Sequence, residues 1–378
     1  MPLKIAIVTE YYYPLLGGIT EHVHHTALRL RGRGHTVKIM TSGVADTGLP
    51  LREAVAPAAD IIRIGRSIPV RSNGSVARAT VGLHLFRDLR RTFLREQFDI
   101  AHLHSPLVFT LPAISVLASP CRSVGTFHSY FEGSRVYAVF RNVLQRHLLD
   151  KLDGQSFVSK SCIAALEPYF RLHDPRVIPN GIDTTIFSPS VPRLESFDGR
   201  KRTLLFLGRF DRRNGLGLMI EAFALVRSSR QDVRLIVVGD GRDRQAFERR
   251  VPTGLRQDVH FVGPALASRP RYYATCDIFC SPIDTASFGV TLLEAMASGK
   301  PVVATDNVGY RDLLGSDEGV LVPPGDAVAF AQAITTLLDD DARRRELGAN
   351  GVRKASRYDW DHVVDQTLEL YQEILSRP

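Results

Sequence analysis

The sequence predicts an α/β protein of two domains, each built around a parallel β-sheet. Three observations lead to this prediction. The chain has 378 residues, which is long for one domain and sufficient for two. Short apolar segments typical of buried strands alternate with longer segments typical of helices. A polar, turn-rich segment at about residues 189–202 interrupts this alternation, which then resumes, so we place the linker between the domains there.

The first domain is expected to cover residues 1–190. Its first buried strand is residues 5–8, and a loop containing Gly17-Gly18 leads into a helix over about residues 20–33. Gly34 is a plausible end for this helix. Further strands are predicted at 37–40, 61–64, 98–104, 123–127, 155–159 and 176–178, with a helix at 81–97.

The second domain is expected to cover residues 200–360 with the same rhythm. Strands are predicted at 203–207, 234–238, 259–261, 278–281, 301–304 and 319–322, and helices at 218–228, 292–298 and 327–339. A last helix, at about 361–378, is long enough to pack back on the first domain. Open parallel sheets bind ligands at the carboxyl ends of their strands, so the chemistry is expected in a cleft between the two sheets.

Composition narrows the function classes without naming one. The net charge of +8 favours anionic partners such as nucleotide diphosphates or phospholipid headgroups. The sequence has no signal peptide and no run of about 18 apolar residues, so we expect a cytoplasmic protein that is at most peripheral to the inner face of the cell membrane. The four cysteines lack zinc-site spacing, and we expect buried apolar thiols, no disulfide and no structural metal.

Three glycine-containing loops follow predicted strands. Gly17 and Gly18 allow close approach of a ligand to the backbone, and the next helix offers free N–H groups to an anion. Arg209, after Gly208, can bind a diphosphate and the charge of a leaving phosphate. Taken alone, glycines and an arginine at such positions more often form an ordinary loop and a surface ion pair. Gly239-Asp-Gly241 begins a dinucleotide fingerprint, but Arg244 replaces its third glycine, which disfavours nicotinamide binding.

The segment at residues 287–304 is the most specific one in the chain. A loop enters a helix that carries Glu294, and a Gly-Lys-Pro turn then leads to a strand. Backbone N–H groups around Gly289 would meet a phosphate, and Glu294 could accept both ribose hydroxyls. Apolar neighbours indicate that the Glu294 carboxylate is buried and therefore needs partners. His128, at the end of another strand, can donate to a phosphate or a sugar hydroxyl.

These segments together resemble glycosyltransferase family 4, and more closely its bacterial phosphatidylinositol mannosyltransferases. The resemblance covers nearly the whole chain. Its motifs are Pro14-Leu-Leu-Gly-Gly18 with Glu21-His22, Asn73-Gly-Ser-Val-Ala-Arg78, His102-Leu-His-Ser-Pro106, Thr126-Phe-His128, Ile178-Pro-Asn-Gly-Ile-Asp183, Gly208-Arg209 and residues 287–304.

The resemblance implies the GT-B architecture, two Rossmann-like domains that face each other across a cleft. It also implies a retaining, metal-independent transfer of a hexose, mannose among the candidates, from a GDP- or UDP-linked sugar to a lipid or small-molecule acceptor. No nucleic acid partner or cofactor is expected. The implied catalytic residues are His128, Arg209 and Glu294. The implied donor-binding residues are Gly17, Gly18, Arg209, Arg213, Asn214, Gly239, Ser287, Phe288, Gly289, Val290 and Glu294, and the acceptor-binding residues are Tyr11, Asn73, Ser75 and Arg78.

Two positions depart from the family pattern. Asn214 stands where the family has a lysine that contacts the diphosphate, and Ala286 stands where it has a glutamate that contacts the sugar. Losing one preorganised charge contact costs about 3 kcal/mol of transition-state stabilisation. Arg212 or Arg213 is a candidate substitute for the lysine, and Asp284 for the glutamate. The alternative is a catalytically weak nucleotide-sugar-binding protein; an epimerase or a dehydrogenase fits less well.

The predicted helix at 81–97 suggests a membrane-facing surface. Leu85, Leu89 and Phe93 form one stripe, and arginines lie along the other side. A basic amphipathic helix suits an anionic bilayer, and a helix that packs on the sheet with a solvated basic face fits the same pattern. The resemblance favours contact with anionic lipid.

Overall fold

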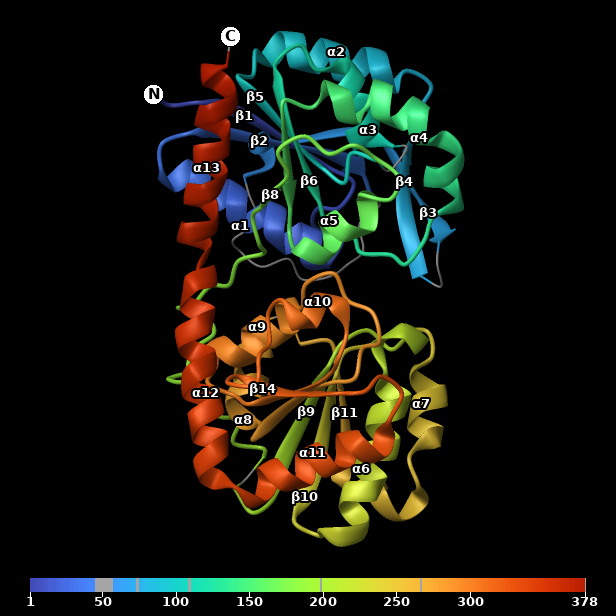
Figure 1. Ribbon diagram of the computed structural model, residues 1–378, viewed down its shortest axis with the longest axis vertical. Coiled ribbons are helices and arrows are strands. Elements are labelled where there is room, and N and C mark those ends of the chain that lie inside the picture. The colour runs from blue at the N-terminus through green and yellow to red at the C-terminus, as the bar shows by residue number, and fades with distance from the viewer. Residues whose placement is uncertain (45–56, 73–74, 108–109, 198, 266, 378) are drawn as a thin grey trace. The chain divides into compact units, whose positions relative to one another are not determined.

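The computed structural model describes residues 1–44, 57–72, 75–107, 110–197, 199–265 and 267–377 (Figure 1). The chain divides into two compact units. Unit 1 combines Met1–Gly181 with Trp360–Pro378, and unit 2 is Ile182–Asp359. The chain therefore passes between the units at residues 181–182 and again at 359–360. The segment at 189–202, where we predicted the linker, lies inside unit 2.

Unit 1 is built on an eight-stranded sheet in the order β4-β3-β2-β1-β5-β6-β7-β8. Its strands are β1 (Lys4–Thr9), β2 (Thr36–Gly43), β3 (Ile61–Ser72), β4 (Ser75–Val81), β5 (Ile100–His104), β6 (Arg122–Phe127), β7 (Gly154–Phe157) and β8 (Arg176–Val177). All neighbours pair in parallel except β3 and β4, which are antiparallel. The predicted strand at 61–64 is thus only the start of a hairpin, which the Asn-Gly pair at 73–74 in the sequence could have signalled.

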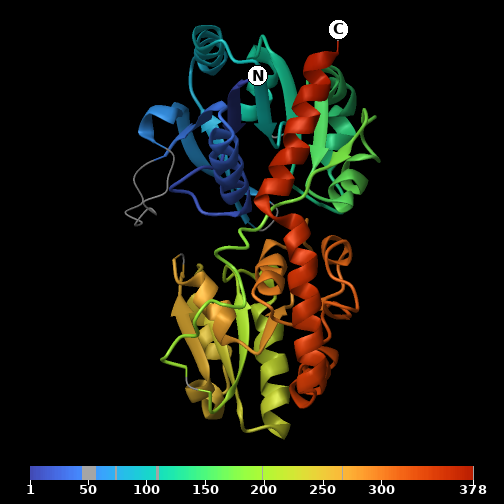
Figure 2. The ribbon, with the colours of Figure 1, turned by 90° about the vertical axis from the view of Figure 1, so that its left-hand side faces the viewer.

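The helices of unit 1 cover both faces of this sheet. They are α1 (Gly18–Gly32), α2 (Leu85–Glu96), α3 (Leu111–Ala118), α4 (Arg135–His147), α5 (Lys160–Leu166) and α13 (Trp360–Ser376). Helices α1 and α13 pack against each other, as Figure 2 shows. Trp360, at the start of α13, is buried in the same hydrophobic cluster as Ile5 and Val23, so the last helix completes the core of unit 1.

A buried carboxylate connects three elements of unit 1. Glu10 directly follows β1, and its side chain accepts hydrogen bonds from the Thr80 hydroxyl of β4 (2.6 Å) and the Leu111 backbone N–H that opens α3 (2.7 Å). A buried carboxylate is costly unless such donors satisfy it. Glu10 therefore fixes α3 against the carboxyl ends of the strands.

Unit 2 is built on a six-stranded parallel sheet in the order β11-β10-β9-β12-β13-β14. Its strands are β9 (Arg202–Leu207), β10 (Val233–Val238), β11 (Val259–Gly263), β12 (Ile278–Ser281), β13 (Val302–Thr305) and β14 (Gly319–Val322). Its helices are α6 (Leu216–Ser229), α7 (Arg244–Arg250), α8 (Arg269–Thr275), α9 (Val290–Ala297), α10 (Val308–Arg311), α11 (Ala327–Asp339) and α12 (Asp341–Ala355). Strands and helices alternate in both units, around a mainly parallel sheet in unit 1 and a fully parallel one in unit 2, which confirms the predicted fold class.

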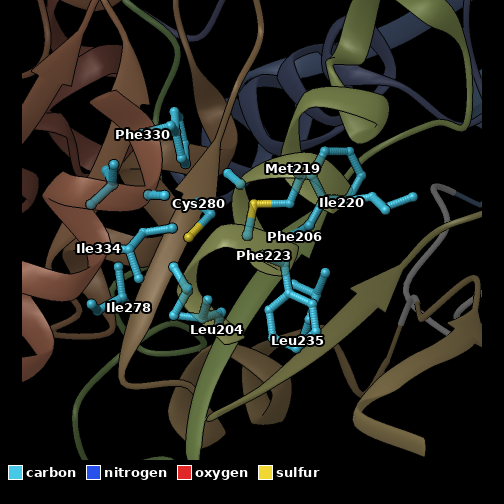
Figure 3. Packing of buried hydrophobic residues seen from close by; sticks show 14 of the residues in the cluster. Leu204, Phe206, Met219, Ile220, Phe223, Leu235, Ile278, Cys280, Phe330 and Ile334 are labelled. Carbon is cyan, nitrogen blue, oxygen red and sulfur yellow. The ribbon is translucent and has the colours of Figure 1, made fainter. Parts of the chain in front are cut away.

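The core of unit 2 lies between the sheet and the helices α6 and α11. Figure 3 shows Leu204 and Leu235 from the strands meeting Phe223 from α6 and Ile334 from α11. Cys280 lies in this core and is fully buried, as predicted, and Cys162 and Cys276 are also buried. Cys121 is only half-buried, so the prediction for that thiol was wrong. Cys121 directly precedes β6 and contacts the Ser119 hydroxyl at 3.3 Å.

Candidate functional site

Four histidines gather at the carboxyl ends of the central strands of unit 1. His102 and His104 are two residues apart on β5, so both side chains lie on one face of the sheet, with ring centroids 4.5 Å apart. His128 follows β6, and its Nε2 lies 2.8 Å from Nδ1 of His104. His22 of α1 packs edge-on against His128, with centroids 5.0 Å apart. The predicted residue His128 therefore belongs to this cluster, in which it is half-buried while the other three histidines are buried.

Hydrogen bonds fix the two outer members of this cluster. His22 Nδ1 lies 2.9 Å from Asn180 Oδ1, and His102 Nδ1 lies 2.6 Å from the Tyr371 hydroxyl of α13. Burial lowers the pKa of His22 to about 4 and that of His102 to about 3. Burial also holds the pKa of His104 well below its usual range. All three rings are therefore neutral at physiological pH.

Neutral rings restrict which nitrogen of His128 carries the proton. Burial and the neighbouring histidines hold the pKa of His128 well below its usual range. One nitrogen of the His104–His128 pair must donate and the other must accept. Nε2 of His104 is buried without a hydrogen-bond partner among the described residues, and an unpaired buried N–H is less tolerable than an unpaired acceptor. This favours a His104 Nδ1–H donor, which leaves His128 protonated on Nδ1 as an uncharged donor.

The predicted anion loop in unit 1 has open space in front of its glycines. Gly17 is the N-cap of α1 and Gly18 is its first residue. A Cβ added at either glycine would meet no described atom within 4 Å. The first N–H groups of a 15-residue helix are thus presented at an uncrowded surface, which suits a bound anion.

Two of the four predicted acceptor residues meet in the structure. The Tyr11 hydroxyl accepts a hydrogen bond from the backbone N–H of Arg78 on β4 at 3.0 Å. Ser75 is the first residue of β4, and Asn73 lies outside the described residues. The contact places Tyr11 beside the β3–β4 hairpin, whose sequence carries the predicted acceptor motif.

The loop after β9 holds Arg209 with its side chain 68% exposed. Asp211 accepts from the backbone N–H groups of Arg213 and Asn214, and a short 3₁₀ turn (Arg212–Asn214) follows. The side-chain amide of Asn214 donates to the carbonyl oxygen of Arg209 at 2.8 Å. Asn214, which replaces the family lysine, therefore ties down the backbone that presents Arg209.

Close backbone contacts position this loop against its neighbours. Gly239 directly follows β10 and has a φ of 133°, and a Cβ there would lie 1.9 Å from the carbonyl oxygen of Gly208. At Gly215, with a φ of 73°, a Cβ would lie 1.8 Å from the carbonyl oxygen of Pro282. Only glycine is compatible with these approaches. They bring the loops after β9, β10 and β12 together.

Helix α9 carries Glu294 into the interior, where its side chain is only 2% exposed. Arg269 of α8 forms an ion pair with one carboxylate oxygen at 2.9 Å, and the Tyr273 hydroxyl donates to the other at 2.8 Å. The expectation that this buried carboxylate has partners is met by these two side chains. Burial and the nearby Glu294 carboxylate keep the pKa of Tyr273 well above its usual range, so the tyrosine is a donor.

The remaining predicted donor residues surround the start of α9. Gly289 is the N-cap with a φ of 109°, and a Cβ there would contact the Tyr310 ring at 2.9 Å. Phe288 is buried, whereas Ser287 and Val290 on either side are half-buried. Desolvation raises the pKa of Asp284, the nearest carboxylate before Ala286 in the chain. Within the described part of the chain, no three or more His, Cys, Asp or Glu residues are grouped to hold a metal ion.

The prediction of a membrane-facing surface on α2 was wrong about which apolar side chains are exposed. Its stripe of Leu85, Leu89 and Phe93 is buried inside unit 1 and cannot touch a bilayer. The exposed side instead carries Phe86 and Leu94 in a shallow groove whose other lining residues are Arg87, Arg90, Arg91 and Arg95. Among the described helices, none is both long and apolar enough to span a bilayer.

Comparison with known proteins decides the family. Residues 16–186 match the description "Glycosyltransferase Family 4", and residues 201–340 match "Glycosyl transferases group 1". The chain is 33% identical over 377 residues to a phosphatidyl-myo-inositol mannosyltransferase of Mycobacterium leprae, covering 98% of this chain and 97% of the relative. The chain belongs to glycosyltransferase family 4. It is a glycosyltransferase, and the resemblance inferred from its motifs is confirmed.

Solved structures confirm the GT-B fold of this family 4 chain. A glycosyltransferase from Rickettsia africae aligns over 100% of both chains with a TM-score of 0.79 and 21% identity. An Anabaena protein in complex with UDP and glucose aligns over 98% of this chain and 100% of its own, with a TM-score of 0.78 and 19% identity. Similarity at this level of identity concerns the fold.

Sequence reasoning missed several residues that hold the site together. His104 was quoted only as part of the motif at residues 102–106, and Arg269 and Tyr273 were not named, although each contacts a predicted catalytic residue. The spacing of His102 and His104 in a strand was a usable signal, because residues two apart share a face. The partners of Glu294 come from α8, about 20 residues earlier in the chain, and no local pattern marks them.

Proposed function

We propose that this family 4 enzyme transfers a hexose, with mannose as the first candidate, from a GDP- or UDP-linked sugar to a phosphatidylinositol-type lipid. The observation that carries the proposal is the full-length similarity to phosphatidyl-myo-inositol mannosyltransferases at 33% identity. The exposed Arg209, the neutral His128 and the exposed basic side of α2 fit that chemistry.

In the proposed reaction the configuration at the sugar C1 is retained and no metal takes part. The bond between C1 and the diphosphate oxygen breaks, and C1 bonds to the acceptor oxygen on the same face. The acceptor proton passes to the leaving phosphate oxygen. Arg209 would stabilise the negative charge that develops on that phosphate. His128, an uncharged donor, would orient a sugar hydroxyl without repelling the positive charge that develops at C1.

The buried carboxylate has a distinct part in this proposal. Glu294 would receive the ribose hydroxyls while Arg269 and Tyr273 fix its orientation. The short helix that begins at Gly289 would direct N–H groups at the diphosphate. Gly17 and Gly18 would offer the corresponding groups of α1.

The test is transfer of labelled sugar to phosphatidylinositol in mixed micelles, with GDP-mannose and UDP-sugars supplied in parallel. Arg209→Ala is expected to lower kcat/KM by at least about a hundredfold, because one preorganised charge contact is lost. Arg249→Ala is the matched control, since Arg249 lies on the exposed side of α7. Normal turnover in Arg209→Ala would contradict the assigned role, and no transfer from any donor would contradict the function.

A second candidate is a weakly catalytic nucleotide-sugar-binding protein, which Asn214 and Ala286 favour. The Asn214 side chain donates a hydrogen bond to the backbone carbonyl of Arg209, and it has no positive charge to place on a diphosphate. This candidate predicts calorimetric binding of a nucleotide sugar without turnover. The double substitution Asn214→Lys and Ala286→Glu would then raise turnover, whereas in an efficient enzyme it would not.

A further inference from the structure

Helix α4 carries an apolar stripe that faces solvent. Val136, Val139, Phe140 and Val143 follow the i, i+3, i+4, i+7 pattern that places side chains on one side of a helix. All four are exposed, Val139 at 74% and Val143 at 55%. A surface helix of a soluble protein normally directs this pattern into its core, so the arrangement on α4 is inverted.

The side of α4 next to the stripe explains why the helix lies this way. Ser134 caps its first turn, and the Tyr137 ring packs edge-on against Phe131 and Phe170. Leu144 is the one buried side chain of the helix. These contacts fix α4 on unit 1 through Tyr137 and Leu144, and they leave the valine stripe without a cover among the described residues.

Charge indicates what kind of surface fits this stripe. Helix α4 contains Arg135, Arg141, Arg146 and His147 and no acidic residue. Arg135 and Arg146 lie along one edge of the stripe, because helix positions advance by about 100° per residue. Two copies of α4 packed face to face and antiparallel would bring these arginines together. An anionic bilayer offers apolar chains to the valines and phosphates to the arginines.

The topology of unit 1 places α4 on the same face of the sheet as α3, on which the basic helix α2 packs. From β1 the chain crosses through α1 to β2, toward the β4 edge of the sheet. From β5 it crosses through α3 to β6 and through α4 to β7, toward the β8 edge. Right-handed crossovers therefore put α3 and α4 on the face of the sheet opposite α1. Helix α2, with its exposed arginines, packs on α3.

We propose that α4 inserts its stripe of Val136, Val139, Phe140 and Val143 into the headgroup region of an anionic lipid bilayer. The arginines at its edge pair with lipid phosphates. This inference rests on the proposed lipid-directed function. It adds a second helix to the exposed side of α2 as a surface for lipid contact.

The first test is co-sedimentation with vesicles that mix phosphatidylcholine and phosphatidylglycerol. The double variant Val139→Ser and Val143→Ser is expected to bind at least about tenfold more weakly, because two partly inserted apolar side chains are lost. Val328→Ser is the matched control, since Val328 lies on a helix of unit 2 with the same 55% exposure as Val143. Unchanged binding of the double variant would overturn the proposal.

The second test measures insertion directly. Trp360, the sole tryptophan of the sequence, is buried in unit 1, so bilayer quenchers should not reach it. Phe140→Trp adds a reporter on the stripe, and Val328→Trp adds one elsewhere. Brominated lipid chains are expected to quench the added fluorescence of Phe140→Trp alone. Equal quenching of both variants, or none, would overturn insertion.

Three outcomes separate membrane docking through α4 from the proposed function and from self-association. The wild-type protein could fail to bind anionic vesicles and still glycosylate detergent-solubilised phosphatidylinositol. That result would refute docking through α4 and support the proposed glycosyl transfer. If the valine variant changes only the sedimentation mass of the protein in solution, the stripe is an interface between copies of the chain. Vesicle binding without any sugar transfer would instead refute the function and leave the docking intact.

Discussion

The buried histidines predict a steep loss of stability in mild acid. His22 and His102 have folded-state pKa values of about 4 and about 3, below the ordinary value of 6.5. Below pH 6.5 these two histidines bind protons in the unfolded chain but stay neutral in the folded chain. The free energy of unfolding therefore falls as the pH falls. At about pH 5 each histidine removes about 2 kcal/mol, or about 4 kcal/mol together. The loss continues until the folded rings themselves are protonated.

Trp360 makes this loss measurable in unit 1 alone. Its ring stacks on His25 at 5.1 Å and packs edge-on against His22, so its fluorescence reports the unfolding of this core. Urea titrations at neutral pH and at about pH 5 give the two free energies. A change of about 2 kcal/mol moves the midpoint by about 1 M urea. Midpoints are preferable to intensities because protonated histidines quench a neighbouring indole.

A matched pair of variants decides whether the buried rings are the cause. His102→Gln removes one titrating ring and keeps hydrogen-bonding atoms, so its acid-induced loss should be about 2 kcal/mol smaller than that of the wild type. His173→Gln, at a histidine whose side chain is 52% exposed, is the surface control. An equal acid loss in wild type and His102→Gln would refute the reasoning.

Substitutions at three further sites, Glu10, Arg269 and Gly239, test other contacts. Glu10→Ala should lower stability by about 2 kcal/mol in urea unfolding, because two buried donors lose their acceptor, and Glu10→Gln should cost less. Arg269→Met should cost about 3 kcal/mol by removing the ion-pair partner of a buried carboxylate, and adding Glu294→Gln should recover part of it. Gly239→Ala should lower the thermal midpoint sharply, whereas Gly254→Ala, with open space at its Cβ, should not. Equal midpoints in the two glycine variants would contradict the packing argument.

The local signals of the sequence predicted much of the fold. Apolar runs such as residues 5–8 and 234–238 appear as β1 and β10, because a strand buried on both faces of a parallel sheet has few alternatives. The β3–β4 hairpin was missed because its strands carry exposed and polar residues that weaken the apolar signal. Helix α4 was missed for a related reason, since its apolar side faces solvent.

The candidate site also has one part that the sequence predicted and one part that it could not predict. Residues in strand-end loops, such as His128 and Arg209, could be singled out because the carboxyl ends of parallel strands are where ligands bind. Their supporting contacts could not be predicted. The pairing of His128 with His104 and of Glu294 with Arg269 joins separate elements, and only packing of the folded chain determines which side chains meet.

The discontinuity of unit 1 has a consequence for biosynthesis. Its core needs α13, which follows all of unit 2 in the chain. On the ribosome, residues 1–181 must therefore wait, with the apolar surface beneath α13 uncovered, while the whole of unit 2 is translated and free to fold. We expect nascent chains stalled before Trp360 to hold a protease-resistant unit 2 beside an immature first unit that attracts chaperones.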